Sequence, residues 1–148
     1  MRHGEASLQA PSDIERPLTE RGMAQTKSLL KRYANDFSSI KTIYASPYLR
    51  AQQTAELVSD ALGLPISTMT SITPDGNPRR VSDELFESKE SAGDIILITH
   101  MPFVGGLNSL LTCGDSSYPE PFVTSQVVVL EAEQILPGCM SKEKILIP

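Results

Sequence analysis

Apolar positions along this chain alternate between helical and extended spacing, which predicts alternating helices and strands. Over Thr19–Phe37, apolar and small side chains recur every three or four residues, the pattern of an amphipathic helix that Thr19 can cap. Ile40–Ala45 (IKTIYA) then favours a short strand. Ser46-Pro47 combines an N-cap with a proline suited to the first helical position, and the apolar stripe that follows ends at Gly63.

The second half of the chain continues this alternation. We expect a strand over 65–69, a helix over 79–90, a strand over 94–99, a helix from Pro102 to about Leu111, and two β-rich segments, 123–131 and 144–148, that pair antiparallel. The run 94–99 (DIILIT) is almost wholly apolar, as expected of a strand buried on both faces. Strands that alternate with helices predict a mostly parallel sheet with helices on both of its faces.

Length and charge narrow the class of protein. At 148 residues the chain is expected to form one domain, 1–148, with a single core. The net charge of −5 disfavours a general nucleic-acid binder, which needs a basic surface. The sequence contains neither an apolar run long enough for a membrane span nor a signal-peptide pattern. Cys113 and Cys139 form no cluster, so we expect a reduced, cytoplasmic protein without nucleic-acid or membrane partners.

Basic side chains follow the predicted strands. His100 comes directly after DIILIT, Arg50 lies in the first turns of the helix after IKTIYA, and His3 stands where a first strand would end. Because ligands bind at the carboxyl ends of parallel strands, we expect these three residues at one sheet edge. Arg2 and Arg16 add positive charge there. Arginines that match phosphate oxygens, beside an imidazole that can attack, predict a phosphoryl-transfer site.

The two histidines need different protonation states for that chemistry. An attacking His3 must be neutral, and its other ring nitrogen is expected to donate to a backbone carbonyl. A protonated His100 would stabilise the transferring phosphoryl group.

These residues resemble the histidine phosphatase superfamily, which includes the phosphoglycerate mutases. The motif RHG at residues 2–4, with a second histidine at the end of a later strand, is the first point of likeness. Five further blocks in the same order are similar to SixA-type phosphohistidine phosphatases, namely RPLTERG (16–22), SPYLRAQQTAE (46–56), TPDGNP (73–78), LITHMPFVGGL (97–107) and VTSQVVVLE (123–131). RHG alone is a weak signal, whereas ordered blocks along nearly the whole chain are a strong one.

The resemblance implies a three-layer α/β/α fold and metal-free hydrolysis, without a cofactor, through a covalent phosphohistidine intermediate. By the same resemblance, His3 is the nucleophile, and Arg2, Arg50 and His100 complete the phosphate pocket. Arg16 is placed at the substrate-binding rim of the pocket. The implied substrate and partner is a histidine-phosphorylated protein, such as a phosphotransfer domain, and a monomer is expected.

The sequence does not identify a general acid. Larger relatives take a carboxylate from an insertion for which this chain has little room, and the candidates here are Glu5, which could also bind substrate, Asp75 and Glu84. An imidazole leaving group, with an ordinary pKa of about 6.5, needs less protonation than an alcohol. A site without a strong general acid therefore favours a phosphohistidine substrate. The alternative is a phosphatase or mutase that acts on a small phosphate ester.

The opening MRHGEA leaves open whether the chain is part of a longer protein or is truncated. Relatives carry an apolar first strand before RHG, and most of that strand is missing here, since Met1 stands where its last residue would be. We expect Met1 to be an internal residue of a longer protein; a truncated chain could instead fray His3 and leave a non-catalytic phospho-binding module.

A metal-dependent hydrolase using His3, His100 and a carboxylate is disfavoured, because the neighbouring arginines would repel a cation.

Overall fold

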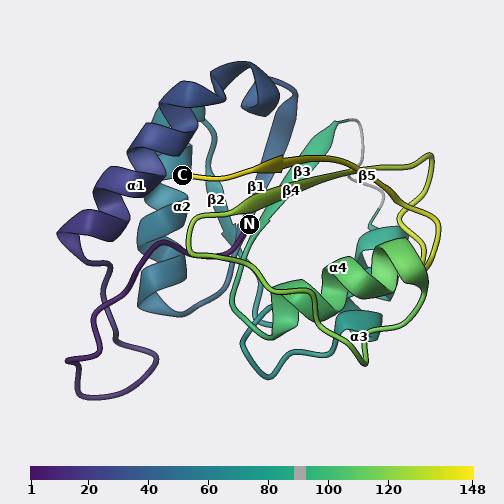
Figure 1. Ribbon diagram of the computed structural model, residues 1–148, viewed down its shortest axis with the longest axis horizontal. Helices are drawn as coiled ribbons and strands as arrows, with labels where there is room; N and C mark the ends of the chain where they lie inside the picture. The colour runs from purple at the N-terminus through teal and green to yellow at the C-terminus, as the bar shows by residue number, and fades with distance from the viewer. Residues whose placement is uncertain (89–92) are drawn as a thin grey trace.

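Helices and strands alternate along the chain in a computed structural model that describes residues 1–88 and 93–148 (Figure 1). In chain order the elements are α1 (Glu20–Arg32), the 3-10 helix η1 (Ala34–Phe37), β1 (Ile40–Ala45), α2 (Leu49–Leu62), β2 (Ile66–Thr68), α3 (Pro78–Glu87), β3 (Asp94–Ile98), α4 (Phe103–Cys113), β4 (Val127–Glu131) and β5 (Ser141–Leu146). No helix in these two ranges is long and apolar enough to cross a membrane.

The strands form a parallel sheet and an antiparallel pair. The sheet has the order β2-β1-β3, and β4 pairs with β5. Ala45 at the end of β1 is aligned with Ile98 at the end of β3, so the carboxyl ends of both strands reach the same edge. The predicted parallel sheet and the predicted antiparallel pairing of the C-terminal segment are both confirmed.

The first three residues lie between β3 and the start of β4. Thr99 donates its backbone N–H to the Met1 carbonyl at 3.0 Å and accepts from the His3 N–H at 2.9 Å. On the other side, Arg2 and His3 make backbone hydrogen bonds of 3.0 and 3.1 Å with residues 125–126. His3 therefore occupies the end of a strand position beside β3, as predicted, and backbone hydrogen bonds on both sides hold it there rather than leaving it frayed.

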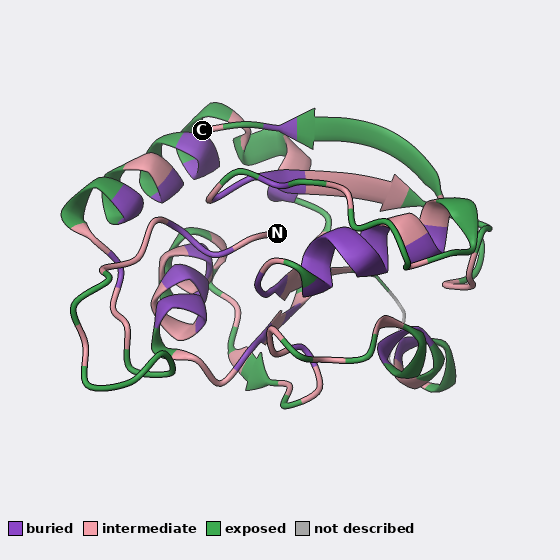
Figure 2. Cartoon of the chain, turned by 60° about the horizontal axis from the view of Figure 1, so that its bottom comes forward, coloured by how far each residue is buried: buried purple, intermediate pink, exposed green. Residues whose placement is uncertain are grey.

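Alternate residues of the parallel strands face two separate apolar clusters. Ile43 of β1 and Ile98 of β3 join a cluster formed with α1 and α2. Tyr44 and Leu97, one position away, pack against a second cluster formed with α3 and α4. The buried positions of α1 face inward, and α4 is buried along most of its length (Figure 2). Helices therefore cover both faces of the sheet, which makes the three layers of an α/β/α fold.

The helix predicted over Thr19–Phe37 is shorter than expected. Thr19 does cap it, because its side chain accepts a hydrogen bond from the Gly22 N–H. However, α1 ends at Arg32, and the segment that contains Asn35 and Asp36 forms the 3-10 helix η1 instead. Both residue types compete with the helical backbone for hydrogen bonds, which favours a turn at this point.

The second helix begins later than the Ser46-Pro47 pattern predicts. The N-cap of α2 is Tyr48, in an extended conformation. The Ser46 hydroxyl instead lies 2.7 Å from Nε2 of His100, so a tertiary contact takes the oxygen that a helix cap would have used. Gly63 ends the helix in a left-handed conformation with φ 68°, as predicted.

The remaining elements lie where the sequence predicts them, with shifted ends. Positions 89 and 90 of the predicted helix 79–90 lie outside the described residues, and α3 itself ends at Glu87. β4 begins at Val127 rather than at residue 123, because Ser125 has a positive φ of 63°, which an extended strand does not accommodate. β5 begins at Ser141, ahead of the predicted residue 144.

Candidate active site

Three side chains predicted at one sheet edge meet there. Nε of Arg50 lies 3.2 Å from Nε2 of His3, and the rings of His3 and His100 have centroids 5.0 Å apart. The exposed fraction is 7% for His3, 4% for Arg50 and 1% for His100. They converge because β1, β3 and the first three residues run parallel and end at the same edge.

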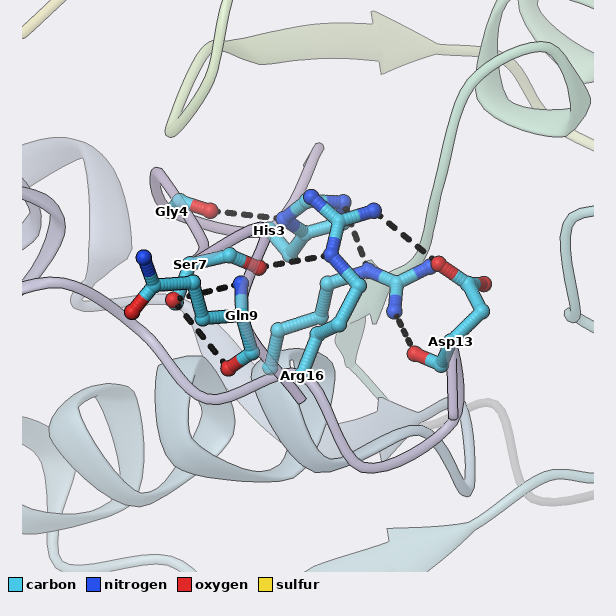
Figure 3. Close-up of polar contacts among 7 residues, drawn as sticks. His3, Gly4, Ser7, Gln9, Asp13 and Arg16 are labelled. Atoms are coloured by element: carbon cyan, nitrogen blue, oxygen red, sulfur yellow. Dashed lines mark hydrogen bonds and ion pairs between the residues drawn. The ribbon is translucent and has the colours of Figure 1, made fainter. Parts of the chain in front are cut away.

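Neighbouring groups hold the His3 ring in one tautomer. Nδ1 lies 2.6 Å from the Gly4 carbonyl oxygen, which can only accept, so Nδ1 carries the proton (Figure 3). Nε2 therefore presents a lone pair, which accepts a hydrogen bond from Nε of Arg50. Burial is the main cause that lowers the pKa of His3 to about 4, and the charges of nearby arginines add to it, although the Gly4 carbonyl opposes them. At pH 7 the ring is neutral, and the predicted bond from its second nitrogen to a backbone carbonyl is confirmed.

His100 lies beside His3, with ring centroids 5.0 Å apart, and is neutral in the free protein. Burial, followed by the positive charges of His3 and Arg50, lowers its pKa to about 3, so the ring is neutral at pH 7 in the free protein. Nε2 bonds the Ser46 hydroxyl at 2.7 Å. Nδ1 is buried and has no hydrogen-bond partner among the described residues. The expectation that a protonated His100 stabilises the transferring phosphoryl group concerns the site with substrate bound, and it stays a prediction.

Arg2 borders an open depression above His3. One terminal nitrogen of Arg2 donates to the Phe122 carbonyl at 2.6 Å, and its buried Nε has no partner within the described part of the chain. The depression has a volume of about 610 Å³ and is lined by Arg2, His3, Glu5, Ala6, Ser7, Leu8, Gln9, Arg16, Thr19 and Thr124. Most of its wall therefore comes from the irregular segment that follows RHG.

Arg16 stands at the rim of this depression, as the resemblance implies. Its Nε donates to the Ser7 carbonyl at 2.6 Å, and its Nη1 bonds Oδ1 of Asp13 at 2.9 Å (Figure 3). The second carboxylate oxygen of Asp13 accepts from Nη2 of Arg50 at 3.0 Å. Asp13 therefore joins the rim arginine to the buried arginine. Hydrogen bonds from Arg16 and then from Arg50 hold the pKa of Asp13 below its usual range, so the carboxylate is ionised.

Sequence reasoning missed two residues of this arrangement. Asp13 lies in a segment without periodicity, and its spacing of three from Arg16 is the only local signal. The sequence pattern predicts Ser46 as a helix cap, whereas its place directly after β1, level with His100 after β3, is the signal that indicates a partner for that histidine.

Of the three candidate acids, only Glu5 is among the residues that line the depression. Its carboxylate accepts from the Thr19 hydroxyl at 2.8 Å and lies 3.7 Å from the Arg21 guanidinium. Glu84 is instead bound to Ser71 and Arg80. Asp75 is not among the lining residues.

The site is built from arginines and histidines rather than from a set of metal ligands. Within residues 1–88 and 93–148, no three histidine, cysteine, aspartate or glutamate side chains are placed to hold a metal ion. Arg50 instead contacts the lone pair of a neutral imidazole, and the charges of Arg2, which has a nitrogen without a partner among the described residues, and Arg16 lie near the same ring. Such an arrangement can bind a tetrahedral oxyanion and present a nucleophile to it.

Comparisons with known proteins agree with this chemistry. A profile of the histidine phosphatase superfamily (branch 1) matches residues 1–73. The chain is 35% identical over 137 residues to the phosphohistidine phosphatase SixA of Escherichia coli (strain K12), covering 90% of this chain and 84% of that protein. It is 36% identical over 115 residues to a SixA homolog of Haemophilus influenzae, covering 71% of this chain and 70% of that protein.

A solved structure has the same fold as this chain. The structure of the protein histidine phosphatase SixA complexed with tungstate superposes with a TM-score of 0.88 at 32% sequence identity. The match covers 100% of this chain and 94% of that one.

Proposed function

This chain belongs to the histidine phosphatase superfamily, and we propose that it removes the phosphoryl group from phosphohistidine in another protein, with His3 as the nucleophile. The observation that carries the proposal is the state of His3. Its ring is neutral, Nδ1 is tied to the Gly4 carbonyl, the Nε2 lone pair accepts from Arg50, and His3 lines the depression together with Arg2 and Arg16. Holding the ring by its second nitrogen removes the rotational freedom that an attacking imidazole would otherwise lose.

The reaction proceeds in two displacements. In the first, Nε2 of His3 attacks the phosphorus of a phosphohistidine whose other ring nitrogen carries a proton. The P–N bond to the substrate imidazole breaks, and its electron pair stays on the leaving ring nitrogen, so the substrate ring departs as a neutral imidazole. In the second, water attacks the phosphorus of phosphorylated His3. The new P–N bond breaks, inorganic phosphate leaves, and His3 regains its neutral, Nδ1-protonated form.

Positive charge near the phosphorus stabilises both transition states. Arg2 and Arg50 lie beside the nucleophile and can donate to the equatorial oxygens of the phosphoryl group. Nδ1 of His100 is buried without a partner among the described residues, so it is free to face the same group. A bound phosphoryl group carries negative charge, which raises the pKa of His100 and favours its protonation only when substrate is present.

The weak acid at the rim fits a phosphoramidate substrate. Glu5 lines the depression, where with Arg16 it forms the substrate-binding rim, but its carboxylate accepts from Thr19 and has no bond to His3 among the described contacts. An imidazole leaves without strong acid assistance, because its conjugate acid has a pKa of about 6.5. None of these steps uses a metal ion or another cofactor.

The curated relatives support the substrate class. Two of them are named as a phosphohistidine phosphatase and its homolog, and the chain covers 84% and 70% of their lengths. The partner in this proposal is therefore a protein domain that carries phosphohistidine. The chain acts on it as a single copy of one domain, 1–148, in the cytoplasm.

The test is phosphate release from a histidine-phosphorylated carrier domain, with EDTA present throughout. We expect His3→Ala to lower the rate by at least about a thousandfold, since the nucleophile cannot be replaced. Glu15→Gln serves as the matched control, because Glu15 lies in the segment after RHG and its carboxylate bonds only the Ser12 hydroxyl among the contacts described. This control should keep its full rate.

Rapid quenching with a radiolabelled carrier tests the covalent step separately. A labelled, acid-labile form of this chain should accumulate in the wild type and be absent from His3→Ala. Equal rates in wild type and His3→Ala would contradict the proposal, and so would comparable rates on phosphohistidine and on an unactivated alkyl phosphate ester. Activity that is lost with EDTA would contradict the metal-free part of it.

A further inference from the structure

Asp13 lies between Arg16 and Arg50, with one carboxylate oxygen on each guanidinium. Oδ1 accepts from Arg16 at 2.9 Å, and Oδ2 accepts from Arg50 at 3.0 Å. The backbone carbonyl of Asp13 also accepts from Nη1 of Arg50. An ionised carboxylate with one oxygen on each guanidinium is the geometry in which a phosphoryl group would bind the same two side chains.

Every nitrogen of the Arg50 guanidinium is already engaged in the free protein. Nη1 and Nη2 bond Asp13, and Nε donates to Nε2 of His3. The last of these bonds uses the lone pair that His3 needs for attack. These bonds use three of the five N–H groups of Arg50, so a phosphoryl group gains the donors that now face His3 and the Asp13 carboxylate only by replacing those two partners.

Asp13 is well suited to be exchanged. Its side chain is 54% exposed, whereas that of Arg50 is only 5% exposed. A half-exposed carboxylate that returns to water regains its hydration, so its departure costs little, whereas an arginine left buried without an anion would be costly. The buried arginine therefore needs an anion at all times, and the mobile member of the pair is the carboxylate.

We propose that Asp13 is an internal competitor of the substrate, whose carboxylate holds Arg16 and Arg50 until a phosphoryl group replaces it. This inference rests on the proposed function, since it takes the same arginines as the phosphate site. A phosphoryl group has three non-bridging oxygens, enough to satisfy both guanidinium groups and to free the His3 lone pair for attack. Asp13 thus sets how strongly an anion must bind before the site becomes reactive.

The test is the affinity of the whole chain for inorganic phosphate and for tungstate, measured by titration calorimetry at pH 7. Asp13→Asn keeps the shape of the side chain but removes the charge that competes. We expect it to bind both anions about tenfold more tightly than the wild type, the effect of removing a competing ion pair from two arginines. Glu15→Gln removes the same charge two residues away without touching either arginine, and its affinity should stay within about twofold.

Kinetics on the phosphorylated carrier provide the second readout. Asp13→Asn should lower KM and leave kcat within about twofold, because the competitor acts before the chemical step. Unchanged or weaker anion binding in Asp13→Asn would overturn the proposal and make Asp13 a residue that positions Arg50. A large fall in kcat with unchanged anion affinity would overturn it in favour of an acid. A failure of the proposed function appears elsewhere, as phosphatase activity that survives in His3→Ala.

Discussion

The floor and the rim of the site are held in different ways. The floor consists of His3, Arg50 and His100, which are almost fully buried and follow the ends of parallel strand positions. The rim is the segment between RHG and α1, which has no helix or strand and in which Leu8 is 86% exposed. Backbone bonds to neighbouring strand positions hold His3 on the floor, whereas the rim combines loop backbone bonds, such as Ser7 N–H to the Pro17 carbonyl, with exposed side-chain bonds such as that of Asp13 with Arg16.

This difference separates the groups that perform chemistry from those that admit the substrate. A buried polar group has no water to fall back on, so a floor residue gives up a partner only in exchange for another, such as a phosphoryl group. A rim side chain can exchange a protein partner for water at little cost. Substitutions on the floor should therefore affect the chemical step, and those at the rim should affect binding.

The largest contrast is expected between the two arginines that share Asp13. Arg50→Ala should lower kcat/KM on a phosphorylated carrier by about a hundredfold to a thousandfold, the usual effect of removing a buried charge that stabilises a transition state. Arg16→Ala should lower kcat/KM by about tenfold, with the change mostly in KM. Steady-state kinetics measure kcat and KM for both variants, and thermal melting checks that each variant is folded. Equal losses of kcat/KM in the two variants would contradict the distinction between floor and rim.

A smaller effect on kcat is expected from removing the Ser46 hydroxyl, which contacts His100 on the floor of the site. Ser46→Ala removes the hydroxyl that holds Nε2 of His100 and leaves that buried nitrogen unpaired. We expect kcat to fall by about tenfold, which corresponds to the loss of one buried hydrogen bond. Ser71→Ala is the matched control, since its hydroxyl bonds Glu84 away from the depression. An unchanged kcat in Ser46→Ala would mean that the position of His100 does not depend on this bond.

The last effect concerns stability rather than rate. The pKa of His100 is lowered to about 3 in the folded chain and returns to about 6.5 on unfolding, so below pH 6.5 the unfolded state binds a proton that the folded state does not. Stability should therefore fall as the pH drops, by about 2 kcal/mol between pH 7 and pH 5 for this residue. His3, with a pKa of about 4, should add a similar amount.

Urea unfolding at pH 7 and pH 5 measures this linkage. His100→Gln should lose about 2 kcal/mol less than the wild type over that interval. The buried Met1 amine, with its pKa lowered to about 5, also titrates, but it contributes equally to both proteins and cancels in the difference. An identical loss in the two proteins would show that His100 is not held neutral by burial.

Much of the fold could be predicted because its signals are local. The apolar run of β3, the IKTIYA strand and the Gly63 helix end each depend on a few adjacent residues. Errors arose where a distant contact competed with a local signal. Ser46 is a good N-cap by type, yet its hydroxyl bonds His100, and the helix begins at Leu49.

By itself, the sequence determined which basic side chains reach one sheet edge, because strand order and the side-chain period of two decide where a strand end points. It also indicated the phosphoryl chemistry, through residue types suited to it. Only the tertiary structure decided the charge state of the two histidines, since burial and neighbouring arginines lower both pKa values. It alone also placed Asp13 between Arg16 and Arg50, because an irregular segment takes its conformation from the groups it meets rather than from its own pattern.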